Sequence, residues 1–242
     1  MSHQPAAARA FAWAGAGLFV ASLGYFLFTY SITFAEITEG AVTPDPVAID
    51  IALFSVFALH HSIFARERIR AFVRRQASAQ LERSVYVWVA SLMLIGVCYA
   101  WRPVAGTLWQ VSAPWSWLLI AVQVFGAWLT IRSAAVIDPL DLAGVRQVLS
   151  TSNSQLPTPK SEVVEFKTEG PYGWVRHPIY AGWVILVFSV GTMTMTRFVF
   201  AMVSTVYLLI AIPFEERTLQ SHAGAYEDYK RRVPWKLIPR VY

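Results

Sequence analysis

The chain has 242 residues, of which 56% are hydrophobic and only 14% are charged, with a mean hydropathy of +0.46. Soluble domains carry about a quarter charged residues, so this composition indicates a protein whose solvent is a lipid bilayer. A single cysteine, Cys98, excludes an intramolecular disulfide and a cysteine-based metal centre. The net charge of +5 suggests a nucleic-acid partner only until the positions of the charges are considered.

Six apolar stretches come close to the roughly 20 residues that a membrane-spanning helix needs. In chain order they occupy residues 11–34, 47–64, 85–101, 115–136, 179–195 and 197–214. The first stretch is longer than the apolar core of a signal peptide, so we interpret it as a signal anchor. The last two are joined by the short turn GTMTMTR, which predicts an antiparallel helix pair. We therefore expect an all-α integral membrane protein with about six transmembrane helices and a cytoplasmic C-terminal amphipathic helix.

The Lys and Arg residues predict how these helices are oriented. All of the 20 basic residues except Arg102 and Arg197 lie before the first stretch, in the 65–84 and 132–178 loops, or in the tail. Basic residues concentrate in cytoplasmic loops. The distribution predicts that both termini are cytoplasmic, in what is most simply a bacterial inner membrane. The positive charge is then a topology signal, and no nucleic-acid partner is expected.

The chain is expected to form one integrated membrane domain with two regions. Residues 1–136 would be an N-terminal four-helix transmembrane region, and residues 137–242 would hold a cytoplasmic loop, a helical hairpin and a cofactor-binding region. The Ser/Thr/Pro-rich segment 150–162 is predicted to be a mobile loop. The sequence contains no glycine-rich phosphate loop, so a soluble dinucleotide-binding fold is not expected.

The segment WVRHPIYAGW, residues 174–183, places polar residues at the start of an apolar run. Pro178 suits the first turn of a helix, where its missing N–H costs nothing. Arg176 and His177 would then lie at a helix N-terminus, which is a natural anion site. Gly182 would allow another helix or a ligand to approach closely. The alternative is that Arg176 anchors the helix at the interface and His177 caps it.

A second polar segment, PFEERTLQSHAGAYEDYKRRVP, follows the last apolar stretch. Glu215 and Glu216 end that stretch, where carboxylates near lipid are costly and often functional. Four later residues recur at three- and four-residue steps and would share one face of a helix: Leu219, His222, Tyr226 and Tyr229. The alternative is an amphipathic helix that lies on anionic headgroups.

Taken together, GPYGWVRHPIYAGW and FEERTLQSHAGAYEDYKRRVP resemble the C-terminal signature of the isoprenylcysteine carboxyl methyltransferases, whose wider family includes phospholipid methyltransferases. FALHHSIFARERIR, LERSVYVWVASL, WRPVAGTLWQV and DLAGVRQV extend the likeness over most of residues 47–242, toward the NnrU-like and methanethiol S-methyltransferase branch. The resemblance implies S-adenosylmethionine as cofactor. It implies a cofactor pocket lined by Arg176, His177, Pro178, Tyr180, Gly182, Glu215 and Glu216, with Tyr226 and Tyr229 in its lid.

The methyl acceptor is expected to use polar residues further upstream. His60 and His61, at the end of the second stretch, could accept a thiol proton near neutral pH. With Arg176 they are the candidate catalytic residues. The alternatives are a metal or haem ligand and a solvated pair. No carboxylate or cysteine lies at ligand spacing from them, so no metal site is predicted.

The sequence thus predicts a membrane-embedded, S-adenosylmethionine-dependent methyltransferase acting on a small thiol or another small or apolar acceptor. Alternative acceptors within the class are the carboxyl group of a prenylated cysteine and a lipid. Two other classes are also compatible. Sterol-type reductases that use NADPH carry a similar RHP-x-Y-x-G hairpin, and the NnrU likeness allows a non-catalytic membrane protein.

Overall fold

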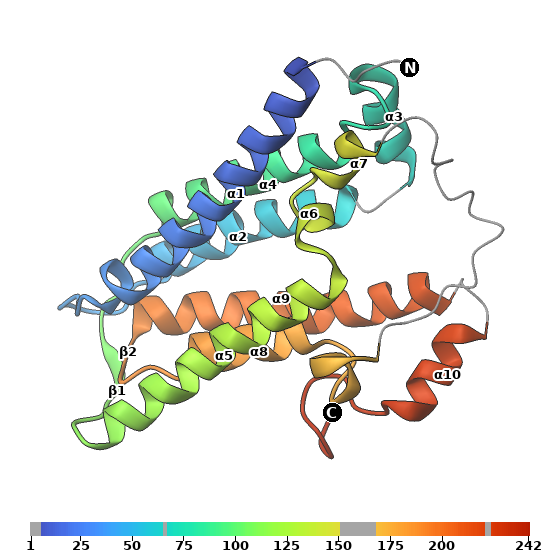
Figure 1. Ribbon diagram of the computed structural model, residues 1–242. Helices are drawn as coiled ribbons and strands as arrows, with labels where there is room; N and C mark the ends of the chain where they lie inside the picture. Colours follow the sequence, from blue (N-terminus) through green and yellow to red (C-terminus); the bar gives the residue numbers. More distant parts are fainter. Residues whose placement is uncertain (1–5, 65–66, 151–167, 221–223) are drawn as a thin grey trace. The chain divides into compact units, whose positions relative to one another are not determined.

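The computed structural model describes residues 6–64, 67–150, 168–220 and 224–242 (Figure 1). The longer helices are α1 (Ala6–Ser31), α2 (Pro44–Phe64), α3 (Glu67–Ala77), α4 (Glu82–Ala100), α5 (Trp115–Ile137), α8 (Pro178–Phe188), α9 (Met195–Gln220) and α10 (Ala225–Arg232). The shorter elements are α6 (Pro139–Leu142), α7 (Arg146–Leu149), the 3₁₀ turns Thr33–Ala35 and Gly170–Gly173, and the strands β1 (Thr107–Gln110) and β2 (Thr192–Thr194). The predicted loop at 150–162 lies outside the described residues except for Ser150, and His222 lies outside them as well.

Among the described residues, five helices are long and apolar enough to cross a membrane: α1, α2, α4, α5 and α9. Their large apolar side chains also point outward. Val20, Trp117 and Ile131 are each 68% exposed, which would be unfavourable in water. The mostly helical chain is therefore an integral membrane protein, and its outer surface is apolar because lipid surrounds it.

The internal contacts divide the chain into two compact units, each assembled from separate segments. The first unit comprises Met1–Phe34, Pro44–Arg102 and Asp138–Glu162, and the second comprises Ala35–Thr43, Pro103–Ile137 and Val163–Tyr242. The units interleave along the sequence, so their boundaries do not coincide with the predicted division after residue 136.

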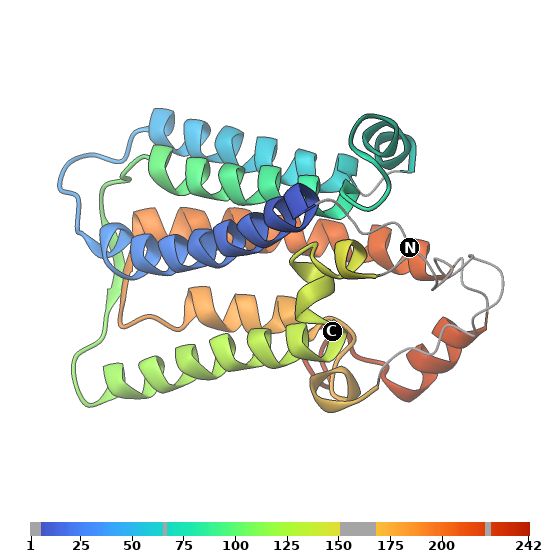
Figure 2. The same ribbon diagram turned by 45° about the horizontal axis from the view of Figure 1, so that its top comes forward.

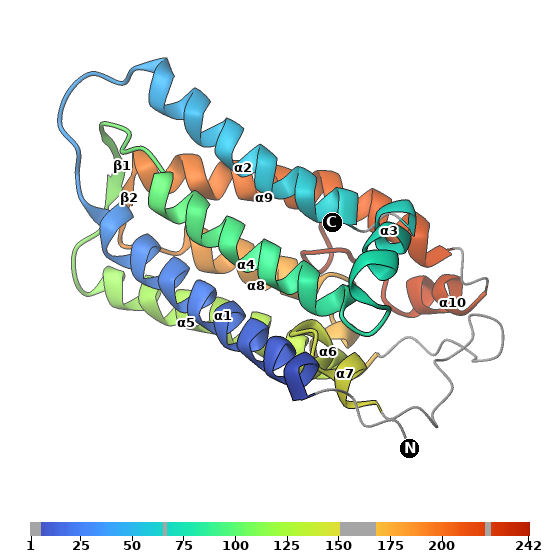
Figure 3. The ribbon, with the colours of Figure 1, turned by 90° about the horizontal axis from the view of Figure 1, so that it is seen from above.

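In the first unit, α4 packs between α1 and α2 (Figure 3). Gly15 of α1 makes the first contact possible, because a Cβ there would lie 2.8 Å from the indole of Trp88. That indole donates a hydrogen bond to the Phe11 carbonyl at 3.0 Å. On the other side, the fully buried carboxylate of Asp50 in α2 accepts a 2.8 Å hydrogen bond from the backbone N–H of Arg102. Hydrogen bonds between side chains and backbone therefore tie α4 to α1 on one side and the residue after α4 to α2 on the other.

The end of the first unit at which α2 ends and α4 begins also contains short helices. The basic segment that the sequence predicts only as a loop forms α3 between α2 and α4. Asp138 caps α6 by accepting from the backbone N–H groups of Leu140 and Asp141. The Ser84 hydroxyl donates to the Gly144 carbonyl at 2.5 Å. Gly144 has φ +73°, and a Cβ there would lie 2.9 Å from the Ser84 backbone, so only glycine fits this crossing.

In the second unit, α8 packs between α5 and α9, with α5 and α8 antiparallel (Figure 2). The backbones of α5 and α8 approach closely at two glycines. A Cβ on Gly126 would lie 2.7 Å from the Leu186 nitrogen, and one on Gly182 would lie 2.7 Å from the Gly126 carbonyl. Of the two roles predicted for Gly182, close approach by another helix is the one found, since α5 fills the space beside its Cα.

Helix α8 is shorter than the predicted stretch 179–195. It has 11 residues and ends at Phe188. Residues Thr192–Thr194 pair antiparallel with Thr107–Gln110 to form a two-stranded sheet, with the Trp109 indole donating to the Val190 carbonyl at 3.0 Å. The predicted end of this helix was wrong, because strand pairing with a distant segment follows Phe188. The predicted pairing with the next helix is found, since α8 packs against α9.

The helix predicted to carry both Leu219 and the two tyrosines is in fact two helices. Leu219 belongs to α9, whereas Tyr226 and Tyr229 belong to α10, which begins after Gly224 at φ +81°. The three side chains nevertheless pack together with Val233. The predicted single helical face is therefore wrong, although its described residues still lie close together.

The α5–α8 crossing makes a prediction about stability. Gly126→Ala should destabilise the detergent-solubilised protein by about 1–3 kcal/mol, because the new methyl group would meet backbone rather than a movable side chain. Gly24→Ala in α1 is the matched control, since no atom lies within 4 Å of its Cβ position. Thermal unfolding of both variants checks this, and equal melting temperatures would contradict the close crossing.

Candidate functional site

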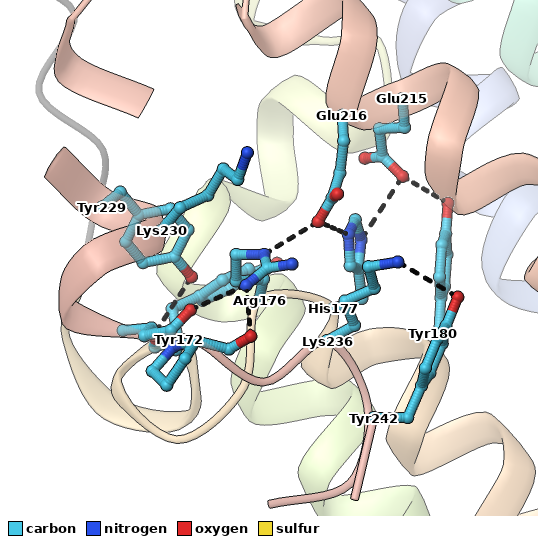
Figure 4. Close-up of polar contacts among 12 residues, drawn as sticks. Tyr172, Arg176, His177, Tyr180, Glu215, Glu216, Tyr229, Lys230, Lys236 and Tyr242 are labelled. Carbon is cyan, nitrogen blue, oxygen red and sulfur yellow. Dashed lines mark hydrogen bonds and ion pairs between the residues drawn. The ribbon is translucent and has the colours of Figure 1, made fainter. Parts of the chain in front are cut away.

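Arg176 lies at the centre of a buried polar cluster in the second unit (Figure 4). Its Nε donates to Glu216 Oε1 at 2.8 Å, and the two side chains are only 5% and 11% exposed. Its Nη1 donates to the carbonyls of Val233 and Pro234 at 2.9 and 2.6 Å. The guanidinium thus joins the start of α8, the end of α9 and the segment after α10.

The backbone repeats this connection. The N–H of Arg176 donates to the Trp235 carbonyl and that of His177 to the Lys236 carbonyl, each at 2.9 Å. The Lys236 ammonium in turn donates to the Tyr242 hydroxyl at 3.2 Å and lies 4.5 Å from the centre of its ring. The C-terminal segment therefore lies directly against the Arg-His pair and fixes its backbone.

His177 lies between two carboxylates. Its Nε2 is 3.3 Å from Glu216 Oε1, and its Nδ1 is 3.6 Å from Glu215 Oε2. The ring stacks on Tyr180 with centroids 5.5 Å apart and planes 10° apart. Burial lowers the pKa of His177 below its ordinary value, although the two carboxylates act in the opposite direction. His177 occupies the cap position of α8, but its side chain does not cap the helix.

The two adjacent glutamates have different environments. Glu216 is buried and paired with Arg176. The Glu215 side chain is 45% exposed and accepts a 2.9 Å hydrogen bond from the Tyr180 hydroxyl. Glu216 is therefore engaged inside the protein, whereas Glu215 presents a negative charge, flanked by an aromatic ring, that a cation or a hydroxyl group could reach.

The α10 tyrosines complete one side of the cluster. The Tyr229 hydroxyl donates to the Tyr172 carbonyl at 2.9 Å, and Tyr226 is 1% exposed. Burial raises the pKa of Tyr229 to about 12. Burial, and then the charge of Glu215, raise the pKa of Tyr172 above its ordinary value. In this structure α10 is closed over the cluster.

The structure brings together most of the residues that the sequence predicts for the cofactor pocket. Arg176, His177, Tyr180, Glu215 and Glu216 form one network, and Pro178 begins α8 as expected. The sequence analysis missed Tyr172, Lys236 and Tyr242. Tyr172 lies inside the first quoted motif and could have been suspected, but the other two join the cluster through the return of the C-terminal segment, which no spacing indicates.

His60 and His61 belong to the first unit, and there they surround Tyr86 of α4. The Tyr86 hydroxyl hydrogen-bonds to His61 Nδ1, and the His60 ring stacks on Tyr86 with planes 7° apart. The Arg83 guanidinium lies 5.8 Å from the centre of the Tyr86 ring. Neither nitrogen of His60 has a hydrogen-bond partner in the part of the chain that the structure describes.

The same unit uses two acidic residues to organise α6 and α7. Asp138 pairs with Arg146, and Asp141 accepts a 2.5 Å hydrogen bond from Gln147. Within the described ranges, no group of three or more His, Cys, Asp or Glu side chains could hold a metal ion.

Comparison with known proteins indicates the class of reaction to which this cluster belongs. Residues 149–221, which include Arg176 through Glu216, match the isoprenylcysteine carboxyl methyltransferase family. Methanethiol S-methyltransferase 2 of Bradyrhizobium diazoefficiens is 35% identical over 82% of this chain and 75% of its own length. Methanethiol S-methyltransferase of Crocosphaera subtropica is 37% identical over 80% of this chain and 74% of its own length.

The chain belongs to this methyltransferase family. Nurim of Danio rerio is also similar, with 31% identity over 75% of the chain and 67% of its own length. No solved structure matches the chain. The family membership covers both units, because the similar segments extend well beyond the polar cluster, and it makes this chain a membrane methyltransferase.

The unequal environments of the two glutamates can be tested by stability. Glu216→Gln should cost about 3–5 kcal/mol, because it leaves a buried guanidinium without its carboxylate. Glu215→Gln is the matched control and should change stability by no more than about 0.5 kcal/mol, since its side chain is half exposed and the amide can still accept from Tyr180. Chemical unfolding in detergent measures both. Equal losses would show that Arg176 does not depend on Glu216.

Proposed function

We propose that the protein transfers a methyl group from S-adenosylmethionine to a small thiol such as methanethiol. The acceptor is taken from the names of its relatives, which span about four fifths of the chain. The donor is taken from the family, together with the cluster around Arg176. One observation carries the proposal: residues 176–216 of the family-matched segment contribute the side chains of a single network, which leaves one carboxylate, Glu215, exposed beside aromatic rings.

The residues of the cluster fit the chemical groups of this donor. S-adenosylmethionine carries a sulfonium, an ammonium, a carboxylate and ribose hydroxyls. Glu215 can accept hydrogen bonds from hydroxyl or ammonium groups, and the Tyr180 and Tyr172 rings can face a cation. Arg176 and His177 lie at the N-terminus of α8, where the helix dipole favours an anion. The donor supplies an activated methyl group when it is bound.

The protein has a limited part to play in such a transfer. The acceptor sulfur attacks the methyl carbon as the bond from that carbon to the sulfonium breaks, which gives a methyl thioether and a neutral leaving sulfide. Alignment of the reacting atoms and exclusion of water supply most of the acceleration. The Arg176–Glu216 pair would fix the donor-side residues rigidly, and α10 would cover them.

A thiol acceptor also has to lose its proton, because the thiolate is the nucleophile. We propose His60 as the proton acceptor in preference to His61. His61 already uses Nδ1 in its bond to Tyr86, whereas both nitrogens of His60 are without partners among the described residues. Stacking on Tyr86 would hold the His60 ring in place, and the Arg83 guanidinium beside the same tyrosine would favour a thiolate.

We propose that both termini face the cytoplasm, in a bacterial inner membrane. The Lys and Arg distribution supports this orientation, which needs an even number of crossings. Helix α8 alone, at 11 residues, is only about 16 Å long. Residues 189–194 follow it, with Thr192–Thr194 in β2, and we propose that α8 and this segment together make the remaining crossing.

The cofactor assignment can be tested by thermal shift of the purified protein with S-adenosylmethionine, S-adenosylhomocysteine and NADPH in parallel. A ligand that binds only the folded state stabilises it by mass action, by about 2.7 kcal/mol at a hundredfold excess over Kd. The melting temperature rises as a result. We expect a shift with the first two ligands and none with NADPH. Glu215→Gln should reduce the shift without lowering the starting melting temperature.

The other outcomes point to the remaining classes. A shift with NADPH alone would indicate a reductase. No shift with any of the three ligands, in a folded sample, would favour a non-catalytic role. If the first two bind, methanethiol, prenylated cysteine and phospholipid are compared as acceptors. Formation of dimethyl sulfide from methanethiol is the result we expect.

The proton acceptor is tested by the acidity of the thiol. His60→Gln should slow methylation of an alkyl thiol at pH 7 by about 10²-fold or more, the usual contribution of a general base. With an acidic aryl thiol, which is already ionised at pH 7, His60→Gln and the unmodified enzyme should react at nearly the same rate. His61→Gln is the matched control and should have a smaller effect on the alkyl thiol. Equal losses with both thiols would indicate that His60 only packs.

A further inference from the structure

Helix α3 has a surface that the catalytic proposal does not use. It joins α2 to α4 at the end where α2 finishes at Phe64 and α4 starts at Glu82, and it contacts both helices (Figure 1). Both neighbours are long and apolar enough to cross a membrane. A helix that connects their ends on one side lies at the edge of the hydrocarbon layer, and with 11 residues it is too short to cross that layer itself.

One side of α3 is bound to its own unit by charge. Arg70 Nε lies 2.5 Å from Glu82 Oε1, and Arg74 Nη1 lies 2.8 Å from Glu82 Oε2. The Glu82 side chain is only 13% exposed, so it is enclosed by these contacts. The two arginines are four residues apart and therefore share one face of the helix. This face sets the rotation of α3 relative to α4.

The opposite side of α3 carries an apolar side chain that the unit does not cover. Phe72 is 61% exposed, and at 100° per residue it lies about 160° round the helix from both Arg70 and Arg74. Arg75, three residues further on, is also exposed on this side. An exposed aromatic ring beside an exposed arginine is the pattern of a helix that lies in a membrane interface.

Charge favours one kind of surface for this face. The sequence of α3 contains four arginines and one glutamate, Glu67, and Glu82 at the start of α4 adds one more carboxylate, so positive charge remains in excess. Basic residues next to membrane-spanning segments attract anionic headgroups. We propose that α3 lies along the bilayer surface and binds anionic phospholipid headgroups, with Phe72 among the upper acyl chains and Arg75 against the lipid phosphates. This proposal goes beyond the methyl transfer and does not depend on it.

The position of Phe72 can be measured directly, because the chain has one cysteine. In a Cys98→Ala background, an environment-sensitive fluorophore is attached at Phe72→Cys or, as the matched control, at Ala71→Cys, about 100° round the helix. The full-length protein is reconstituted in vesicles of phosphatidylcholine and phosphatidylglycerol whose acyl chains carry a quencher. We expect severalfold stronger quenching at position 72 than at position 71.

The role of charge is tested with two variants that lose the same charge. Arg75→Gln should weaken phosphatidylglycerol retention, measured by native mass spectrometry, by about fivefold, the contribution of one arginine near an anionic surface. Arg102→Gln, beyond the opposite end of α4, should change it less than twofold. Equal quenching at positions 71 and 72, or equal effects of the two variants, would overturn the proposal. The proposal would also be overturned if the fluorophore at position 72 is protected from the lipid quencher and this protection disappears when the protein is diluted in lipid. A second copy of the chain would then cover this face.

Discussion

The candidate site depends on one buried ion pair. The Arg176 guanidinium contacts Glu216 and the carbonyls of two residues that follow α10, so three separate segments converge on a single side chain. A buried charge is costly unless its partners are present, and here the charge is paired and hydrogen-bonded. Any change that removes a partner therefore affects the whole cluster. His177 and Tyr180 are affected first, because they are the N-cap residue and a first-turn residue of α8, which begins two residues after Arg176.

The pair also explains why two consecutive glutamates are needed. Neighbouring helical positions point about 100° apart, so one carboxylate can face inward while the next faces the surface. Glu216 neutralises Arg176 and gives rigidity. Glu215 keeps its charge at the surface, with Tyr180 as its hydrogen-bond donor. A single glutamate could not serve both purposes, since the inner one is already bound by the protein.

The sequence predicted those features that have local causes. Prolines bracket α5, which was expected at 115–136 and extends from Trp115 to Ile137, and Pro178 correctly predicted the start of α8. The RHP and EE segments meet because α8 packs against α9, a pairing that the short turn GTMTMTR predicted. The resemblance to a methyltransferase family, drawn from these motifs, is confirmed by the relatives.

The features that escaped prediction have distant causes. Helix α8 ends early because β1, some 80 residues before it, pairs with the following segment. Helix α3 was not predicted, because its arginines were interpreted only as a topology signal. The contacts of Arg176 with residues 233 and 234 use backbone carbonyls, and every residue has one, so no side-chain pattern predicts them. The same holds for His177, whose N–H reaches the Lys236 carbonyl.

The return of the C-terminal segment has a consequence for biosynthesis. Val233 and Pro234, which supply two of the acceptors for Arg176, lie 57 and 58 positions later in the chain. During translation, Arg176 leaves the ribosome before α9 and well before these carbonyls exist. Chains fold progressively as they are made. The segment that carries the Arg-His pair must therefore be inserted with its charge only partly satisfied, and the cluster can close only after Val233 and Pro234 have been made.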